Sequence, residues 1–183
     1  MLTRPIVKPL ALPGVMLITG SRAADERGAF SELFRAPWLA DLGIEKPFVQ
    51  DNVAYNHEAH VLRGLHWQAV PFAQAKWVRC LRGRILDVAA DVCPESPTYG
   101  QWVSHELSGE SAEALFIPER YAHGYLTLEP ETLVFYKVSE LWHPEAERHC
   151  RWDDPTLGIA WGIQHPILSP KDAQAPWLVT NVI

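Results

Sequence analysis

The chain has 183 residues, 48% of them hydrophobic and 21% charged, and a formal net charge of -6 at pH 7. This length and composition are typical of one globular domain and exclude a disordered or membrane-embedded chain. The net negative charge argues against general binding to nucleic acid, which needs clustered lysine and arginine, but it is compatible with one small phosphorylated ligand.

The first 20 residues, MLTRPIVKPLALPGVMLITG, contain three prolines and the charged Lys8. No continuous apolar stretch in them is long enough for a signal peptide or a membrane span. Further along the chain, Cys80, Cys93 and Cys150 form no C-x-x-C pair and leave an odd thiol in any pairing, which predicts free cysteines. We therefore expect a cytoplasmic protein with no membrane partner.

Short runs rich in Val, Ile, Leu, Trp and Tyr recur between Gly, Pro and Asp residues, which is the pattern of β-strands separated by turns. The expected strands are residues 14–19, 47–56, 61–68, 74–92 with a turn at Arg82-Gly83, 101–107, 114–129 and 132–140. Helices are expected only near 36–43 and at 169–173, where Ser169 is a candidate N-cap. This succession predicts an all-β sandwich or jelly roll, as a single domain over residues 1–183.

The strand VLRGLHWQ at 61–68 carries three polar side chains, Arg63, His66 and Gln68, inside an otherwise apolar run. They alternate unevenly, so some of them are expected to face the interior. Buried polar groups are costly unless they find partners, which makes this strand a candidate wall of a binding site.

Two of the eight histidines have an unusual setting. His66 lies in the apolar run above, and His123 lies in YAHGY, beside a glycine that lets a ligand or another backbone come close. Residue type alone leaves a purely structural role open for both. A metal site is not expected, because Gln68 stands where an H-x-H pair would need a second histidine and no other ligand has a supporting spacing.

General acid-base catalysis is the alternative to a metal site. It needs a base, a group that orients this base, and a cation or hydrogen-bond donor that stabilises the developing negative charge. Lys76 lies within a strand pattern, and Tyr136 and Lys137 are expected on opposite faces of another strand. One member of that pair should point inward. Taken singly, each of these residues is also common in ordinary strands.

Ordered segments along most of the chain are similar to those of a known family. They are DERGAFSELF, FVQDN, VLRGLHWQ, QAKWVRCLRGRILDVAADV, SPTYGQWVSHELS, LFIPERYAHGY, VFYKVSE, RWDDPTLGIAW and LSPKDAQAPWL. From about Arg22 to Leu178, the chain resembles the dTDP-4-dehydrorhamnose 3,5-epimerases. The resemblance implies a cupin-like jelly-roll barrel with short flanking helices, and a cofactor-free, metal-independent epimerase of an NDP-4-keto-6-deoxyhexose.

The resemblance also implies catalytic roles. His66 matches the family's base, and Asp172 matches the carboxylate that orients this base. Tyr136 matches the acid on the opposite face of the sugar. Lys76 matches the cation near the 4-keto oxygen. Inversion next to a ketone calls for such a set, because it removes a proton from one face and returns one from the other.

Further positions are implied in binding the nucleotide sugar. They are Arg27, Phe30, Glu32, Gln50, Asn52, Arg63, Gln68, His123, Trp142, Glu147 and Lys171. In the family, the segment that contains Arg27, Phe30 and Glu32 reaches the nucleotide from a neighbouring subunit. The resemblance therefore implies a homodimer.

Several positions depart from the family pattern. The loop VAYNHEAH after Asn52 replaces a serine-containing, basic stretch, so that Tyr55 and Asn56 stand where diphosphate contacts are usual. Trp142 replaces a tyrosine, and Arg120 a glycine. These changes leave open inversion at C3 only or C5 only, another nucleotide, or a larger sugar. A non-catalytic sugar-binding cupin and a metal-dependent cupin enzyme are the alternatives from other classes.

Overall fold

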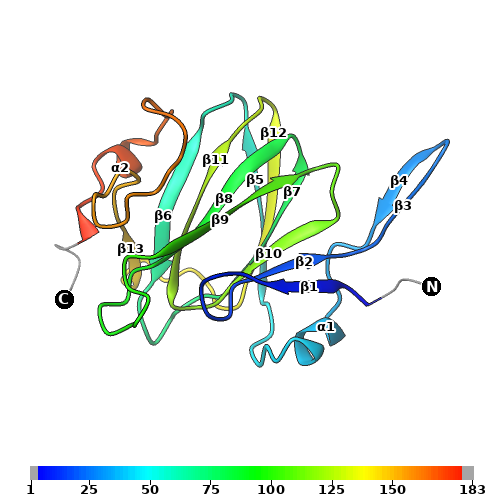
Figure 1. Ribbon diagram of the computed structural model, residues 1–183, viewed down its shortest axis with the longest axis horizontal. Helices are drawn as coiled ribbons and strands as arrows, with labels where there is room; N and C mark the ends of the chain where they lie inside the picture. The colour runs from blue at the N-terminus through cyan, green and yellow to red at the C-terminus, as the bar shows by residue number, and fades with distance from the viewer. Residues whose placement is uncertain (1–3, 179–183) are drawn as a thin grey trace.

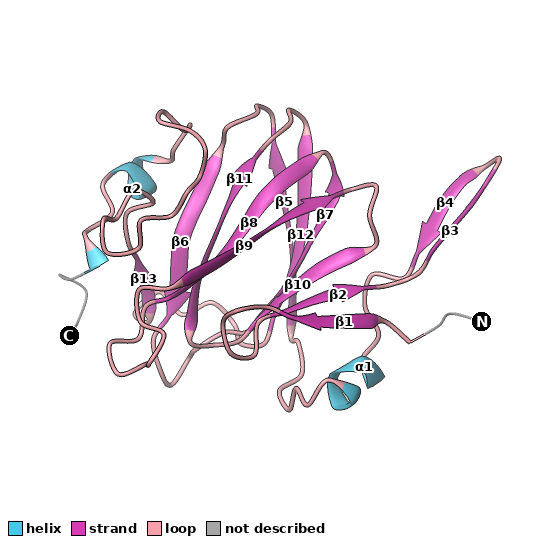
Figure 2. Ribbon diagram, in the orientation of Figure 1, coloured by secondary structure: helices cyan, strands magenta, loops and turns pink. Residues whose placement is uncertain are grey.

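The structure, a computed structural model, describes residues 4–178, and two antiparallel sheets dominate it (Figures 1 and 2). The six-stranded sheet has the order β1 (Ile6–Pro9), β2 (Met16–Thr19), β10 (Glu113–Ile117), β7 (Lys76–Arg82), β12 (Thr132–Val138) and β5 (Gln50–Asn56). The five-stranded sheet has the order β13 (Glu147–His149), β6 (Leu62–Gln68), β11 (Tyr121–Thr127), β8 (Arg84–Asp91) and β9 (Trp102–Ser108). The all-β fold predicted from the sequence is confirmed.

A separate ribbon of two strands, β3 (Arg22–Asp25) and β4 (Gly28–Ser31), projects away from the two sheets (Figure 1). Most of its residues are exposed. A ribbon of this kind buries little apolar surface within its own chain, so packing inside this chain does not explain its length.

The main core lies between the two sheets because alternate residues of each strand point to opposite faces. On β7, Val78 and Cys80 point into this core, where Leu115 of β10 and Ile85 of β8 meet them. Trp77, the residue before Val78, points to the outer face and packs in a different cluster.

Both predicted helices are present and short. Helix α1 (Pro37–Asp41) places Trp38 against the outer face of the six-stranded sheet, where its ring stacks 6.2 Å from that of Trp77. Helix α2 (Pro170–Ala173) begins at the predicted cap, Ser169, whose side chain accepts a hydrogen bond from the backbone of Asp172. Within residues 4–178, no helix is long and apolar enough to cross a membrane.

The predicted turn at Arg82-Gly83 is present, and it connects β7 of the six-stranded sheet to β8 of the five-stranded sheet. Gly83 has φ +76°, and a Cβ at this position would lie 2.3 Å from Oγ1 of Thr132. Only glycine tolerates both the backbone angle and the contact, so the residue is required by the geometry of this turn.

One predicted strand was wrong, and four short strands were not predicted. Residues 114–129, expected as one strand, form β10 and β11, which belong to different sheets and are separated at Pro118, a residue without a backbone donor. The missed strands are β1, β3, β4 and β13. They have three or four residues each and no alternation of buried and exposed side chains, which is the signal that identifies a strand.

Candidate active site

A cavity of about 240 Å³ opens between the sheets, and side chains from five strands line it. The lining residues are Ala54, Arg63, His66, Lys76, His123, Tyr125 and Tyr136. Five of these seven are residues that the sequence singled out. The structure therefore brings together the predicted base, acid and cation.

Two glycines let the strands behind this cavity approach each other closely. A Cβ on Gly64 of β6, where φ is +130°, would lie 2.6 Å from the Cα of Gly124 on β11. The same pair of strands aligns His66 with His123, and the register shifts just beyond His123. The close backbone approach expected beside His123 is present, and it holds the two histidines side by side in the cavity wall.

His66 and Asp172 form a hydrogen-bonded pair although they are 106 residues apart in sequence. Nε2 of His66 lies 2.6 Å from Oδ1 of Asp172, which is buried. Ser169 donates to the other carboxylate oxygen at 2.9 Å. Burial alone would raise the pKa of Asp172, but the hydrogen bonds from His66 and Ser169 outweigh it and leave the pKa below its ordinary value. An ionised Asp172 holds the proton of a neutral His66 on Nε2, so Nδ1 carries the lone pair.

Lys76 supplies a buried cation in the cavity wall. It is 7% exposed, and its Nζ donates to the backbone oxygen of His66 at 3.1 Å. Burial lowers the pKa of Lys76 from 10.5 to about 8, while the negative charges of Asp87 and Glu147 oppose this shift. Lys76 is thus still mostly protonated at pH 7.

Replacing Lys76 with methionine is expected to raise the free energy of unfolding below pH 8. The fall in the pKa of Lys76 from 10.5 to about 8 means that the folded state disfavours a charge that the unfolded chain keeps. The shift corresponds to about 3 kcal/mol. Between pH 8 and 10.5 the unfolded wild-type chain binds more protons than the folded one, so the wild type gains stability with rising pH and the advantage of Lys76→Met fades.

Urea unfolding of both proteins at pH 7 and pH 9.5 measures this effect. Lys8→Met, at an exposed position of β1, is the matched control and should show no such dependence on pH. An equal difference between Lys76→Met and the wild type at both pH values would contradict the prediction.

A second histidine–carboxylate pair lies in the same wall. Nε2 of His123 is 2.7 Å from Oδ1 of Asp87, and both side chains are buried. Burial lowers the pKa of His123 despite the charge of Asp87, so the ring is neutral at pH 7. Sequence reasoning missed Asp87, although a carboxylate in the middle of the apolar strand RILDVAAD was a usable signal.

Two phenols face the cavity, and their hydroxyl groups differ in their partners. Burial raises the pKa of Tyr136, with the nearby charge of Arg63 opposing the shift, and it raises the pKa of Tyr125 to about 12. Both phenols are therefore protonated at pH 7. The hydroxyl of Tyr125 donates to Asn56 at 3.4 Å, whereas that of Tyr136 has no hydrogen-bond partner within residues 4–178. The hydroxyl proton of Tyr136 is therefore available for donation to a ligand, whereas that of Tyr125 is already in a hydrogen bond.

Four of the predicted binding residues lie outside this cavity lining, where they shape its surroundings. Gln68 is buried and donates to the backbone oxygens of Phe72 and Leu141, so it holds the loop that carries Trp142. Trp142 is 58% exposed, and Glu147 forms an ion pair with Lys171 at 2.6 Å.

The remaining predicted residues lie on β5 and near the projecting ribbon. Gln50 donates to Asn52 at 2.7 Å, and Asn52 is the cross-strand neighbour of Tyr136. The other three are Arg27, which pairs with Asp25, Phe30, which is 65% exposed, and Glu32, which pairs with Arg35. None of the five lines the cavity of its own chain.

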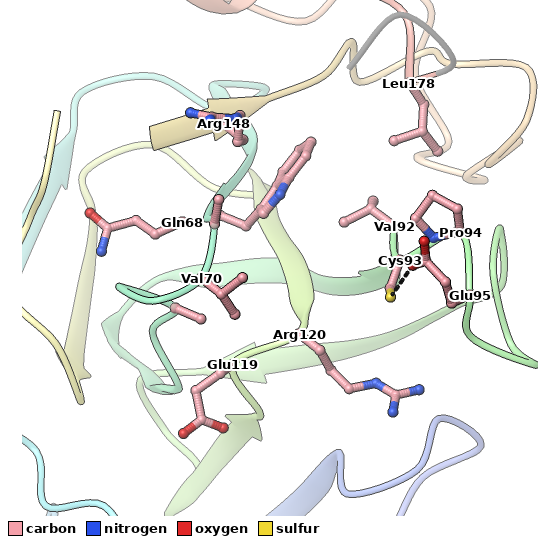
Figure 3. A pocket seen from close by; sticks show the side chains of 13 residues that line it. Gln68, Val70, Val92, Cys93, Pro94, Glu95, Glu119, Arg120, Arg148 and Leu178 are labelled. Carbon is pink, nitrogen blue, oxygen red and sulfur yellow. Dashed lines mark hydrogen bonds between the residues drawn. The ribbon is translucent and has the colours of Figure 1, made fainter. Parts of the chain in front are cut away.

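A larger cavity of about 450 Å³ lies elsewhere, between loops that include Val70, Pro94 and Arg120 (Figure 3). It contains Gln68 but none of the predicted catalytic residues. Its walls are mostly apolar, and the thiol of Cys93 donates to Glu95. The smaller cavity, which contains the predicted catalytic residues His66, Lys76 and Tyr136, is therefore the candidate active site.

Neither a disulfide nor a cluster of metal ligands was expected from the sequence. Cys80, Cys93 and Cys150 are free thiols, as predicted. Among the residues that the structure describes, no group of three or more His, Cys, Asp or Glu side chains is arranged to hold a metal ion.

Comparisons with known proteins agree on one family. The family model described as dTDP-4-dehydrorhamnose 3,5-epimerase matches residues 9–180. The dTDP-4-dehydrorhamnose 3,5-epimerase of Sinorhizobium fredii is 45% identical over 174 residues, which cover 92% of this chain and 87% of the relative. The dTDP-4-dehydrorhamnose 3-epimerase of Streptomyces niveus is 35% identical over 170 residues, covering 92% of this chain and 82% of the relative.

A solved structure extends the agreement to the fold. The crystal structure of dTDP-6-deoxy-D-glucose-3,5-epimerase from Legionella pneumophila, in complex with dTDP-4-keto-L-rhamnose, matches with a TM-score of 0.92 and 38% identity. The match covers 97% of this chain and 95% of that one. It confirms the cupin-like jelly roll expected from the sequence.

Proposed function

The chain belongs to the dTDP-4-dehydrorhamnose 3,5-epimerase family and is a carbohydrate epimerase, and from this premise we propose that it inverts carbons next to the ketone of a dTDP-4-keto-6-deoxyhexose. One observation carries the proposal. His66, which is hydrogen-bonded, and Tyr136, whose hydroxyl has no hydrogen-bond partner among residues 4–178, line one cavity from opposite sheets, since β6 and β12 belong to different sheets. A base and an acid that face each other across a sugar are what inversion requires.

The first half of the reaction is removal of a proton. A hydrogen on the carbon next to the C4 ketone is weakly acidic. The lone pair on Nδ1 of His66 accepts this proton, while Asp172 holds the other ring nitrogen, Nε2, in a hydrogen bond. Negative charge then develops on the ketone oxygen, and the ammonium of Lys76 stabilises the enolate. Asp172 stabilises the imidazolium that forms.

The second half returns a proton from the opposite face. Tyr136 donates its hydroxyl proton to the carbanion-like carbon, and water later reprotonates the phenolate. The raised pKa of Tyr136 keeps the phenol protonated at neutral pH, so the acid is loaded before each turnover. His66 loses the abstracted proton to solvent. In D₂O the Tyr136 hydroxyl exchanges with solvent and carries deuterium, so inversion leaves a deuterium label on the carbon.

Incubation with dTDP-4-keto-6-deoxyglucose in D₂O tests the proposed function. We expect deuterium at both C3 and C5 by NMR. Label at C3 alone would support the second candidate, a 3-epimerase, which the similarity to the Streptomyces niveus protein favours. No label from folded wild-type protein would contradict the proposal, and a stoichiometric metal required for activity would favour the metal-dependent cupin alternative.

We also propose that the enzyme acts as a homodimer in which the projecting ribbon reaches the neighbouring subunit's site. The exposed Phe30 and Arg27 lie on this ribbon and do not line their own cavity, which supports the proposal. An exposed aromatic ring beside a cation suits a nucleotide that stacks on the ring and carries phosphates.

Mixing two inactive variants tests this arrangement. One is His66→Asn and the other carries Arg27→Ala and Phe30→Ala together. If the ribbon serves the partner, random exchange of subunits makes about half of the dimers mixed, with one intact site each, and restores about a quarter of wild-type activity. If the ribbon serves its own chain, no mixed dimer has an intact site, and activity does not return.

A further inference from the structure

A buried amide at the end of β5 holds an arginine of the cavity wall. Asn56 is 2% exposed, and its Nδ2 donates to the backbone oxygens of Thr132 at 3.2 Å and Ala54 at 3.4 Å. Its Oδ1 accepts from Nε of Arg63 at 2.9 Å and from the hydroxyl of Tyr125 at 3.4 Å. Backbone oxygens only accept and a guanidinium only donates, so these partners allow one orientation of the amide.

The guanidinium of Arg63 has few other contacts. No carboxylate lies within 4.0 Å of it in residues 4–178, and its second hydrogen bond, to the backbone oxygen of Tyr55, is long at 3.5 Å. A guanidinium carries five N–H donors, so most of them remain for a ligand. The side chain is exposed and lines the cavity beside His66 and Tyr136.

We propose that Asn56 is a positioning residue that aims Arg63 at the phosphate oxygens of the nucleotide sugar, with Tyr125 as a second contact that holds the amide oxygen. The inference rests on the proposed function and extends it to two residues without an assigned role. An arginine on a flexible stem pays conformational entropy when it binds an anion. A fixed Nε removes part of this cost and leaves the outer edge of the guanidinium free for bidentate contact with phosphate.

The position of Asn56 explains why an amide serves here and a carboxylate does not. Aspartate would place negative oxygens against the backbone oxygens of Thr132 and Ala54, which Nδ2 now satisfies. It would also neutralise the charge of Arg63. The amide fixes the guanidinium and leaves its full charge available to the ligand.

The test measures dTDP binding by calorimetry, together with kcat and KM for the sugar nucleotide. Asn56→Leu keeps the volume but removes the amide, and it should weaken dTDP binding and raise KM by about tenfold while kcat changes by less than about threefold. Tyr125→Phe removes one hydroxyl and should weaken binding by about two- to threefold. Thr132→Val is the matched control, because Thr132 faces Asn56 across the strands but its hydroxyl bonds Glu129.

Two outcomes would overturn the inference. One is folded Asn56→Leu with wild-type affinity for dTDP, and the other is an equal loss of affinity in Thr132→Val. If Asn56→Leu does not fold, Asn56→Ser must show the loss instead, since a hydroxyl on a shorter side chain cannot hold both Arg63 and Tyr125. Wild-type protein that binds dTDP but leaves the sugar unlabelled in D₂O would contradict the proposed function and not this inference.

Discussion

Replacing His66 with asparagine should lower kcat by about 10²–10⁴, because a positioned general base contributes a factor of this size. The substitution removes Nδ1 as an acceptor of the substrate proton but keeps a polar side chain of similar reach. Deuterium exchange at C3 and C5 should fall together with turnover, since both begin with the same proton transfer. Steady-state kinetics and NMR of the sugar in D₂O measure the two quantities.

Two further variants make the result specific. His165→Asn alters an exposed histidine of the C-terminal region and should leave turnover unchanged. Asp172→Asn should slow turnover strongly while preserving the fold, because an amide no longer fixes the imidazole in one tautomer or stabilises the imidazolium. Exchange that persists at the wild-type rate in His66→Asn would assign the base to another residue.

Tyr136→Phe should separate exchange from inversion. The base, its carboxylate and the cation remain, so the substrate still loses its proton and regains one from the same face. Inversion needs the hydroxyl on the opposite face, and its loss should lower the rate of inversion by about 10²–10⁴. NMR should therefore show deuterium in a sugar that retains its configuration.

Tyr125→Phe provides the comparison for this variant. Both substitutions remove one hydroxyl from the same cavity, but the hydroxyl of Tyr125 already donates to Asn56. Inversion should survive in Tyr125→Phe with a raised KM. Inversion at the wild-type rate in Tyr136→Phe would contradict the assigned acid.

The strand pattern predicted that residues 61–68 form a wall of the cavity, but it did not predict which polar side chains of this strand line the cavity. The polar residues of VLRGLHWQ pointed to a binding wall, and Arg63 and His66 do line the cavity. Gln68, from the same pattern, instead supports the loop beside it. Residue type could not separate these cases, because the difference lies in which backbone groups come close after folding.

The partners of the two histidines show where sequence reasoning stops. Asp172 is 106 residues from His66, so no local pattern joins them, and only the resemblance to a family identified the pair. Asp87 and Tyr125 were missed because they look like ordinary strand residues, and Asn56 was noted only as a departure from the family pattern. Their importance depends on the register between strands, which brings Asp87 opposite Tyr125.

Asp172, the proposed orienting carboxylate, belongs to α2, the last helix that the structure describes, whereas His66, the proposed base, lies on β6. Proteins are synthesised from the N-terminus, and a nascent chain on the ribosome holds its early strands before this helix has emerged. Such a chain has the imidazole, the ammonium and the phenol, but the imidazole is not yet oriented. Under the proposed mechanism, the site is therefore complete only after α2 has been synthesised and has docked beside β6.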